Sequence, residues 1–226
     1  MGKGKDLVLL HGYLSSKESF MAQVRYFSQF YRVTAFDFLG FGQSAPLQEP
    51  FSVSDYAAWT KEVLRALDVE RPHVIAHSFG CRVAVKMASA DAQAFENIVL
   101  TGPAGVIGKR GIGYHSKVRL YRLVKKFAPA YAKTHFGSAE YKTLSPIMQE
   151  SYKKIVNEDL REDARRIQNR TLIIEGVEDR TTPLREAEIY RNCLKKGELK
   201  QMRGGHFAFA EDPVTFNLLV EEFLYE

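Results

Sequence analysis

Ser78 is the residue whose surroundings point most directly to chemistry. It stands in Ala76-His77-Ser78-Phe79-Gly80, between a predicted buried strand and a predicted helix. A sharp turn at such a junction needs small residues two positions to either side of the serine, and Ala76 and Gly80 meet that need. A serine on such a turn can act as a nucleophile when a general base is close. The pentapeptide alone also fits a buried serine in an ordinary strand-to-helix turn.

Strands and helices alternate around this turn. Strands are predicted at 6–10, 31–36, 73–76, 97–100, 171–175 and near 199–202, with helices at about 17–29, from 54, at 79–90, from about 183 and after 213. This alternation predicts a parallel sheet with helices on both faces. The fold class is therefore α/β.

Two of these helices carry a clear apolar face. Ser54 and Asp55 are expected to cap the second helix. Its predicted inner face consists of Tyr56, Trp59, Val63 and Leu67. The last helix is expected to begin at Pro213, and its predicted inner face consists of Phe216, Leu219, Val220 and Phe223.

Further motifs lie at predicted strand ends, and together with the serine turn they resemble those of the α/β-hydrolase family. They are His11-Gly12-Tyr13, a D-x-x-G-x-G-x-S turn at 37–44, an acid loop at 176–183 and a histidine loop at 204–207. The order Ser78, Asp179, His206 is that family's order of nucleophile, acid and base. The resemblance covers nearly the whole chain and implies a serine esterase-like member.

This resemblance assigns a role to each site residue. Ser78 would be the nucleophile of a catalytic triad, His206 the general base, and Asp179 the acid that orients the imidazole. The backbone N–H groups of Tyr13 and Phe79 would form the oxyanion hole. Such chemistry implies no organic cofactor and no metal.

Three other residues compete for these roles. Glu178 is the alternative acid, but the family's acid stands three residues after the glycine and four before the proline, and Asp179 alone fits both distances. His77 adjoins Ser78, but side chains next to each other on a sharp turn diverge, so His77 is interpreted as structural. His11 is expected to shape the oxyanion loop.

The resemblance also implies the domain organisation. Residues 1–104 and 170–226 would form the α/β-hydrolase core, with 105–169 inserted as a helical lid. Members of the family commonly begin with a two-stranded antiparallel hairpin, and only about five residues precede the first strand here. We therefore expect a mostly parallel central sheet of about six strands without that hairpin.

The predicted lid is basic between 109 and 133, where eight Lys and Arg residues precede the first acidic one, Glu140. Two interpretations stay open. The charges can form a solvated outer face of the lid, or they can make weak contact with an anionic surface or gather anionic substrate.

The function expected is hydrolysis of a small or medium acyl ester, with thioesters and amides as further possibilities. Carbon–carbon bond hydrolases of this fold use the same triad, so the triad does not choose the bond. An acyltransferase is a further alternative, although the H-x-x-x-x-D acyltransferase motif is absent. From another class, the scaffold could serve as a non-catalytic ligand-binding protein, although such a protein gains nothing from a strained serine turn.

The resemblance implies a small-molecule acyl substrate as the partner, and composition bears on the other kinds of partner. The longest apolar runs are about four residues, far short of the ~20 that a membrane-spanning helix needs. The net charge of +5 fits anionic ligands and simple solubility equally well, and no nucleic-acid partner is expected. Cys81 and Cys193 lack the spacing of a zinc or redox motif, and both are expected to be reduced, which predicts a cytoplasmic protein.

Overall fold

A six-stranded parallel sheet forms the centre of the molecule in this computed structural model, which describes residues 1–108, 141 and 143–225. The strands are β1 (Asp6–Leu10), β2 (Arg32–Ala35), β3 (His73–His77), β4 (Asn97–Thr101), β5 (Arg170–Gly176) and β6 (Gly197–Met202). Their order across the sheet is β2-β1-β3-β4-β5-β6, and each neighbouring pair is parallel. The expected fold class and sheet of about six parallel strands are confirmed.

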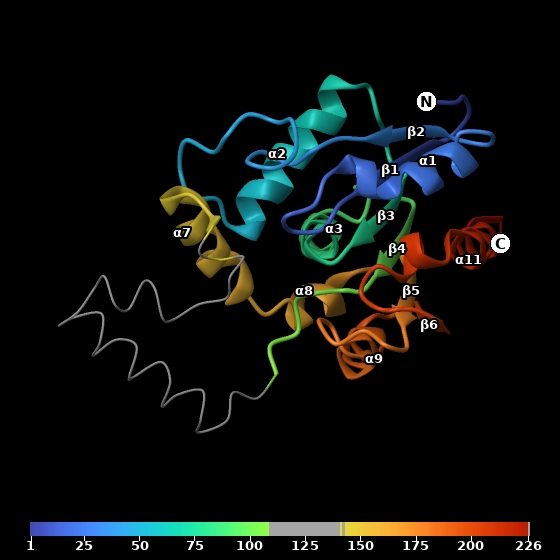
Figure 1. The fold of residues 1–226 in the computed structure, drawn as a ribbon. Helices are drawn as coiled ribbons and strands as arrows, with labels where there is room; N and C mark the ends of the chain where they lie inside the picture. The colour runs from blue at the N-terminus through green and yellow to red at the C-terminus, as the bar shows by residue number, and fades with distance from the viewer. Residues whose placement is uncertain (109–140, 142, 226) are drawn as a thin grey trace.

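Helices cover both faces of this sheet (Figure 1). They are η1 (Lys17–Phe20), α1 (Met21–Phe27), α2 (Val53–Ala66), α3 (Phe79–Ala90), α7 (Pro146–Val156), α8 (Arg161–Arg166), α9 (Leu184–Cys193), α10 (Ala208–Glu211) and α11 (Pro213–Tyr225). In β1, Val8 and Leu10 pack into the core beneath α2, α3, α8 and α9, whereas Leu7 and Leu9 pack beneath α1 and α11. This alternation follows from the two-residue period of a strand, and it explains why the four residues of β1 after Asp6 are all apolar.

The helices differ in detail from those expected. The helix predicted at 17–29 is a 3-10 turn followed by α1, which ends at Phe27, and α10 was not expected. In α2 the cap is Ser52, because the Ser52 hydroxyl and the Asp55 carboxylate form a reciprocal capping box. The predicted cap at Ser54 is therefore wrong.

The buried face of α2 is rotated from the predicted one. It consists of Val53, Tyr56, Ala57, Thr60 and Leu64. Leu67 stands just past the end of the helix and is 48% exposed, so its predicted place on the inner face is wrong. The period was correct, and the predicted Trp59 and Val63 are partly buried.

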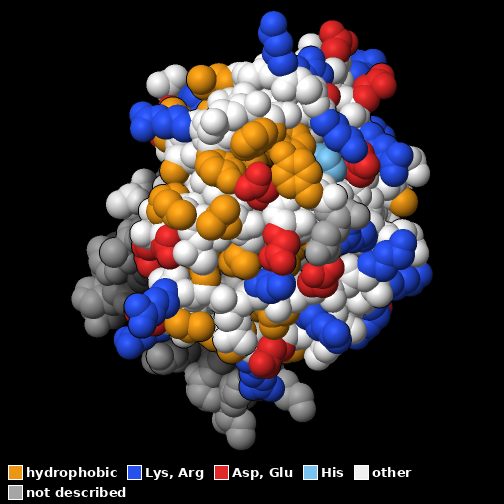
Figure 2. Space-filling view, turned by 90° about the vertical axis from the view of Figure 1, so that its right-hand side faces the viewer, with side chains coloured by type: hydrophobic (Ala, Val, Ile, Leu, Met, Phe, Trp, Pro, Cys, Tyr) orange, Lys and Arg blue, Asp and Glu red, His pale blue; other side chains and the backbone are white. Residues whose placement is uncertain are grey.

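Helix α11 is amphipathic, as predicted. Phe216, Val220 and Phe223 are buried in the core beneath it. Figure 2 views the side of the molecule on which α1 and α11 lie, where hydrophobic side chains gather between charged ones. The exposed large hydrophobic residues of these two helices are Met21, Val214, Leu218 and Tyr225.

The insertion predicted as a lid, 105–169, is described only in part. Residues 109–140 and 142 lie outside the described residues, and so does the basic stretch between 109 and 133. The described part contains α7 and α8, and Pro146 begins α7 at a Ser145 cap instead of breaking a helix. Two hydrogen bonds close the base of the insertion, from Leu160 N to Gly105 O at 2.9 Å and from Ile107 N to the Asp159 carboxylate at 3.2 Å. We call this closed base the neck.

No helix among residues 1–108, 141 and 143–225 has the length and apolar character to cross a membrane.

One acidic side chain, Glu175, is fully buried near the end of β5. Neither of its carboxyl oxygens has a hydrogen-bond partner within the part of the chain that the structure describes. Burial, together with the nearby Asp179 carboxylate, raises the pKa of Glu175 to about 9. The folded protein therefore holds this side chain as a neutral acid at physiological pH.

We predict that Glu175→Gln stabilises the protein more at pH 8.5 than at pH 5.5. Between the ordinary pKa of 4.5 and about 9, the unfolded chain loses the Glu175 proton while the folded chain keeps it. Rising pH therefore favours unfolding by about 1.4 kcal/mol per unit, and glutamine removes this dependence. Thermal melts of both proteins at the two pH values measure the difference.

The exposed neighbour Glu178 provides the control, and Glu178→Gln should give equal melting shifts at both pH values. A Glu175→Gln shift independent of pH would contradict a neutral buried acid.

Candidate active site

Four segments that follow strands meet at one edge of the sheet. Tyr13 follows β1, Ser78 follows β3, Asp179 follows β5 and His206 follows β6. Because all six strands are parallel, their carboxyl ends share this edge. Residues far apart in the sequence are thereby brought together.

Ser78 occupies a strained turn between β3 and α3. Its φ is 50° and its ψ is −104°, a conformation that non-glycine residues rarely adopt. The Ser78 amide donates to Thr101 O on β4 at 3.1 Å, which ties the turn to the neighbouring strand. A Cβ atom on Gly80 would lie 2.2 Å from Leu10 O, so the helix can approach β1 this closely only with glycine there.

Ser78, His206 and Asp179 form a hydrogen-bonded chain. The Ser78 hydroxyl lies 3.0 Å from His206 Nε2, and His206 Nδ1 lies 2.7 Å from Asp179 Oδ2. In the arrangement suited to proton transfer, Nδ1–H donates to the carboxylate and Nε2 accepts from the hydroxyl. The three side chains that the sequence selected thus lie within hydrogen-bond reach of one another.

Asp179 is held by its own loop as well as by His206. Its Oδ1 accepts from the amides of Thr181 at 2.7 Å and Thr182 at 3.0 Å, and its Oδ2 accepts from the Thr182 hydroxyl at 2.9 Å. Burial alone would raise the pKa of Asp179, but the hydrogen bonds from His206 and Thr182 outweigh it and lower the pKa. The carboxylate is therefore ionised, whereas neighbouring Glu178 is exposed.

Sequence analysis missed Thr182. Its hydroxyl also lies 3.2 Å from His206 Nδ1, so it contacts both the acid and the imidazole. The one indication in the sequence was that Thr182 stands three residues after Asp179 in the same loop.

The two other histidines at this edge have structural contacts. His11 Nε2 accepts from the Phe38 amide at 3.1 Å, and Nδ1–H donates to Gly12 O at 2.8 Å. His77 Nε2–H donates to His206 O at 2.8 Å. Burial lowers the pKa of His11, and burial with the adjacent His206 lowers that of His77 to about 3, so both rings are neutral. Each supports a loop of the site, as expected from the sequence.

The turn at 37–44 is stabilised by the Asp37 carboxylate. It accepts from the Lys17 amide at 2.7 Å, from Lys17 Nζ at 2.9 Å and from the Gln43 amide at 2.9 Å. A Cβ on Gly42, whose φ is +51°, would clash with this carboxylate at 2.3 Å. These contacts fix the loop against which the His11 ring rests.

A cavity of about 470 Å³ opens onto Ser78 and His206. Tyr13 and Phe79, the residues expected to supply the oxyanion N–H groups, both line it. Phe79 is the first residue of α3, and the first N–H groups of a helix lack acceptors within the helix. The insertion contributes to the lining of this cavity through Tyr141, Leu144, Tyr152 and Ile155. A larger cavity, about 610 Å³, lies between α2, α3 and α8 and contains none of the three hydrogen-bonded side chains.

Comparison with known proteins agrees with this fold. The family model described as "alpha/beta hydrolase fold" matches residues 6–135. A 2-hydroxymuconate semialdehyde hydrolase from Pseudomonas putida is 29% identical, with 88% of this chain and 79% of that protein covered.

Two solved structures share the fold. An esterase from Exiguobacterium antarcticum has a TM-score of 0.79 at 19% identity, covering 100% of this chain and 94% of that one. A meta-cleavage product hydrolase from Pseudomonas fluorescens has a TM-score of 0.76 at 24% identity, covering 99% and 92%. Because the family model spans more than half of the residues, this chain belongs to the α/β-hydrolase family.

Proposed function

We propose that this protein is a serine hydrolase that cleaves small or medium acyl esters, with thioesters and amides as further substrates. The observation that carries the proposal is the hydrogen-bonded chain from Ser78 through His206 to Asp179. An esterase has the same fold, so this fold can hold the machinery for ester cleavage.

The mechanism assigns one task to each group. His206 Nε2 takes the hydroxyl proton as Ser78 Oγ attacks the carbonyl carbon, and Asp179 stabilises the imidazolium that forms. The amides of Tyr13 and Phe79 stabilise the developing oxyanion, aided by the dipole of α3. His206 then protonates the leaving group, and water activated by the same imidazole releases the acyl group from Ser78.

A carbon–carbon bond hydrolase is the second candidate. It is favoured by the Pseudomonas putida relative, because 2-hydroxymuconate semialdehyde contains no ester and its hydrolysis must break another bond. The same serine, histidine and oxyanion groups would serve either reaction.

Residues 105–169 are proposed as the lid of this site. Supporting this role, Tyr141, Leu144, Tyr152 and Ile155 of this segment line the cavity that Ser78 and His206 also line. The lid would therefore contact the substrate directly and exclude water from the acyl-enzyme.

A cytoplasmic location is part of the proposal. It rests on Cys81 and Cys193, which are both free thiols, as proteins in a reducing compartment commonly have.

We predict that Ser78→Ala lowers ester turnover by roughly 10³- to 10⁶-fold, as other losses of a nucleophile do. Treatment with a fluorophosphonate should leave an adduct on Ser78 that peptide mass spectrometry locates. The exposed Ser54 on α2 is the control, and Ser54→Ala should retain both turnover and labelling. Labelling at another serine would refute the assignment.

Asp179→Asn is expected to lower turnover by about 10⁴-fold while the fold stays intact, because the amide favours the wrong imidazole tautomer. Glu178→Gln, one residue away and exposed, should leave turnover within about twofold of wild type. Steady-state kinetics of the two variants make the comparison. If they exchanged effects, Glu178 would be the acid.

The bond cleaved is tested by comparing 4-nitrophenyl esters of increasing chain length with 2-hydroxymuconate semialdehyde. We expect kcat/KM for the best ester to exceed that for the semialdehyde at least tenfold. Both activities should vanish in Ser78→Ala. The reverse preference would indicate that the protein is a carbon–carbon bond hydrolase.

A further inference from the structure

Arg82 places a buried positive charge in the wall of the active-site cavity. It lies on α3 four residues after Ser78, and residues at this spacing share one side of a helix. Its side chain is 8% exposed and lines the same cavity as Ser78 and His206. Arg82 therefore borders the same space into which the serine hydroxyl opens.

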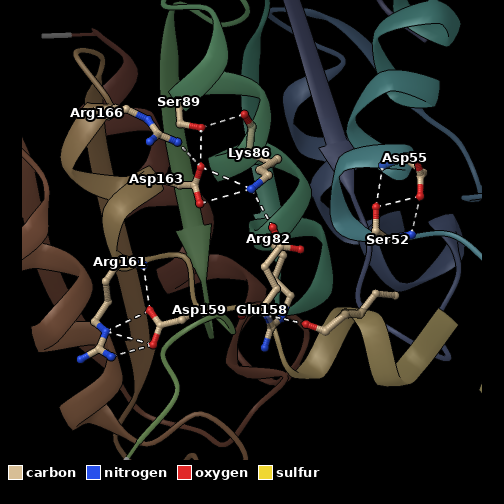
Figure 3. A network of polar contacts seen from close by, with 11 residues as sticks. Ser52, Asp55, Arg82, Lys86, Ser89, Glu158, Asp159, Arg161, Asp163 and Arg166 are labelled. Carbon is tan, nitrogen blue, oxygen red and sulfur yellow. Dashed lines mark hydrogen bonds and ion pairs between the residues drawn. The ribbon is translucent and has the colours of Figure 1, made fainter. Parts of the chain in front are cut away.

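Only one of the three guanidinium nitrogens has an acceptor among the described residues. Nη1 donates to Ile155 O and to Glu158 O, both at 2.9 Å, which anchors the side chain beneath the end of α7 (Figure 3). Nε and Nη2 have no acceptor within residues 1–108, 141 and 143–225. The anchored nitrogen orients the group, and the other two remain available for a ligand.

The acidic side chains around Arg82 are engaged elsewhere (Figure 3). The Glu158 carboxylate pairs with Lys86 at 2.6 Å, and that of Asp159 pairs with Arg161 at 2.7 Å. The Tyr190 hydroxyl is neutral and donates to Ala104 O at 2.8 Å. The described part of the chain places no carboxylate within 4.0 Å of the Arg82 nitrogens.

Glu186 is the remaining acid near Arg82. It stands in the first turn of α9 and lines the same cavity. Burial raises the pKa of Glu186, and the positive charge of Arg82 partly opposes this shift. Glu186 is thus a neighbour whose charge weakens the positive potential of the cavity without forming an ion pair with Arg82.

A buried guanidinium without a paired anion is costly, and arginine's planar fork fits a carboxylate with two parallel hydrogen bonds. We propose that Arg82 binds a carboxylate on the substrate, so that the enzyme acts on acyl compounds bearing a second, anionic group a short distance from the scissile carbonyl. This inference rests on the proposed serine hydrolase function. It deepens that function by naming the substrate class and the residue that selects it.

The test compares charged and neutral esters of equal chain length. Mono-4-nitrophenyl glutarate and 4-nitrophenyl pentanoate place the charge in the acyl part, whereas 4-acetoxybenzoate and 4-acetoxybenzamide place it in the leaving group. We expect wild type to favour the charged member of one pair at least tenfold in kcat/KM. Arg82→Gln should reduce that ratio at least tenfold, and Arg82→Lys should reduce it less.

Two further variants sharpen the comparison. Arg65→Gln removes an exposed basic residue of α2 that does not line the cavity, and it should leave the ratio unchanged. Glu186→Gln removes the competing negative charge and should raise the ratio. Because Arg82 is buried, the preference should persist in 0.5 M salt, which separates it from recruitment by exposed charges of the insertion.

A binding measurement makes the outcome independent of turnover. Calorimetry of Ser78→Ala with monomethyl glutarate should give a dissociation constant at least tenfold lower than with methyl pentanoate, and Ser78→Ala/Arg82→Gln should lose the difference. If Arg82→Gln failed to fold, the proposal would be judged by two other results. Wild type should prefer the charged ester, and Glu186→Gln should raise this preference. Ester hydrolysis without charge preference overturns the Arg82 proposal alone, whereas charge-selective binding without hydrolysis of any ester overturns only the serine hydrolase.

Discussion

The close approach of α3 to β1 at Gly80 is the constraint on which the rest of this site depends. It holds Ser78 in its left-handed conformation, against an intrinsic cost of about 1–3 kcal/mol. The Ser78 amide bonded to Thr101 O and the Cys81 amide bonded to Ser78 O support the same turn from both sides. With the hydroxyl fixed in this way, the imidazole needs only one correct orientation to reach it.

That orientation comes from loops on the other half of the sheet. His206 is fixed by the Asp179 carboxylate at Nδ1 and by His77 at its backbone carbonyl. Asp179 is fixed in turn by two amides and a hydroxyl of its own loop. His206 is thus held by hydrogen bonds to Asp179 and His77. Asp179 is held by backbone amides of the loop after β5, and His77 belongs to β3. Such preorganisation lowers the reorganisation needed during catalysis.

Much of this arrangement was predictable from local patterns. Most of the strands contain short apolar runs ended by turn residues, although β6 is largely polar. Ser78, Asp179 and His206 stand in loops with family-like spacing, so each was identified within a few neighbouring residues. The contribution of Thr182 was not identified, because it depends on a contact between its hydroxyl and the His206 imidazole, which is 24 residues away in the sequence. The cap at Ser52 was missed because Ser54 offers the same chemistry two residues later. Arg82 gave no indication in the sequence, where it reads as an ordinary helical residue, and only the folded cavity shows where its charge lies.

The neck formed at Gly105, Ile107, Asp159 and Leu160 has a consequence for how such a protein can diverge. The two strands that flank the insertion, β4 and β5, pair directly in parallel register, and the neck closes the chain just beyond them. The entropy of closing a loop grows only slowly with its length, so the segment beyond the neck can lengthen, shorten or be exchanged with little cost to the sheet. Natural selection can therefore alter one wall of the cavity, and with it the range of molecules accepted, while the residues on the strand ends remain in register.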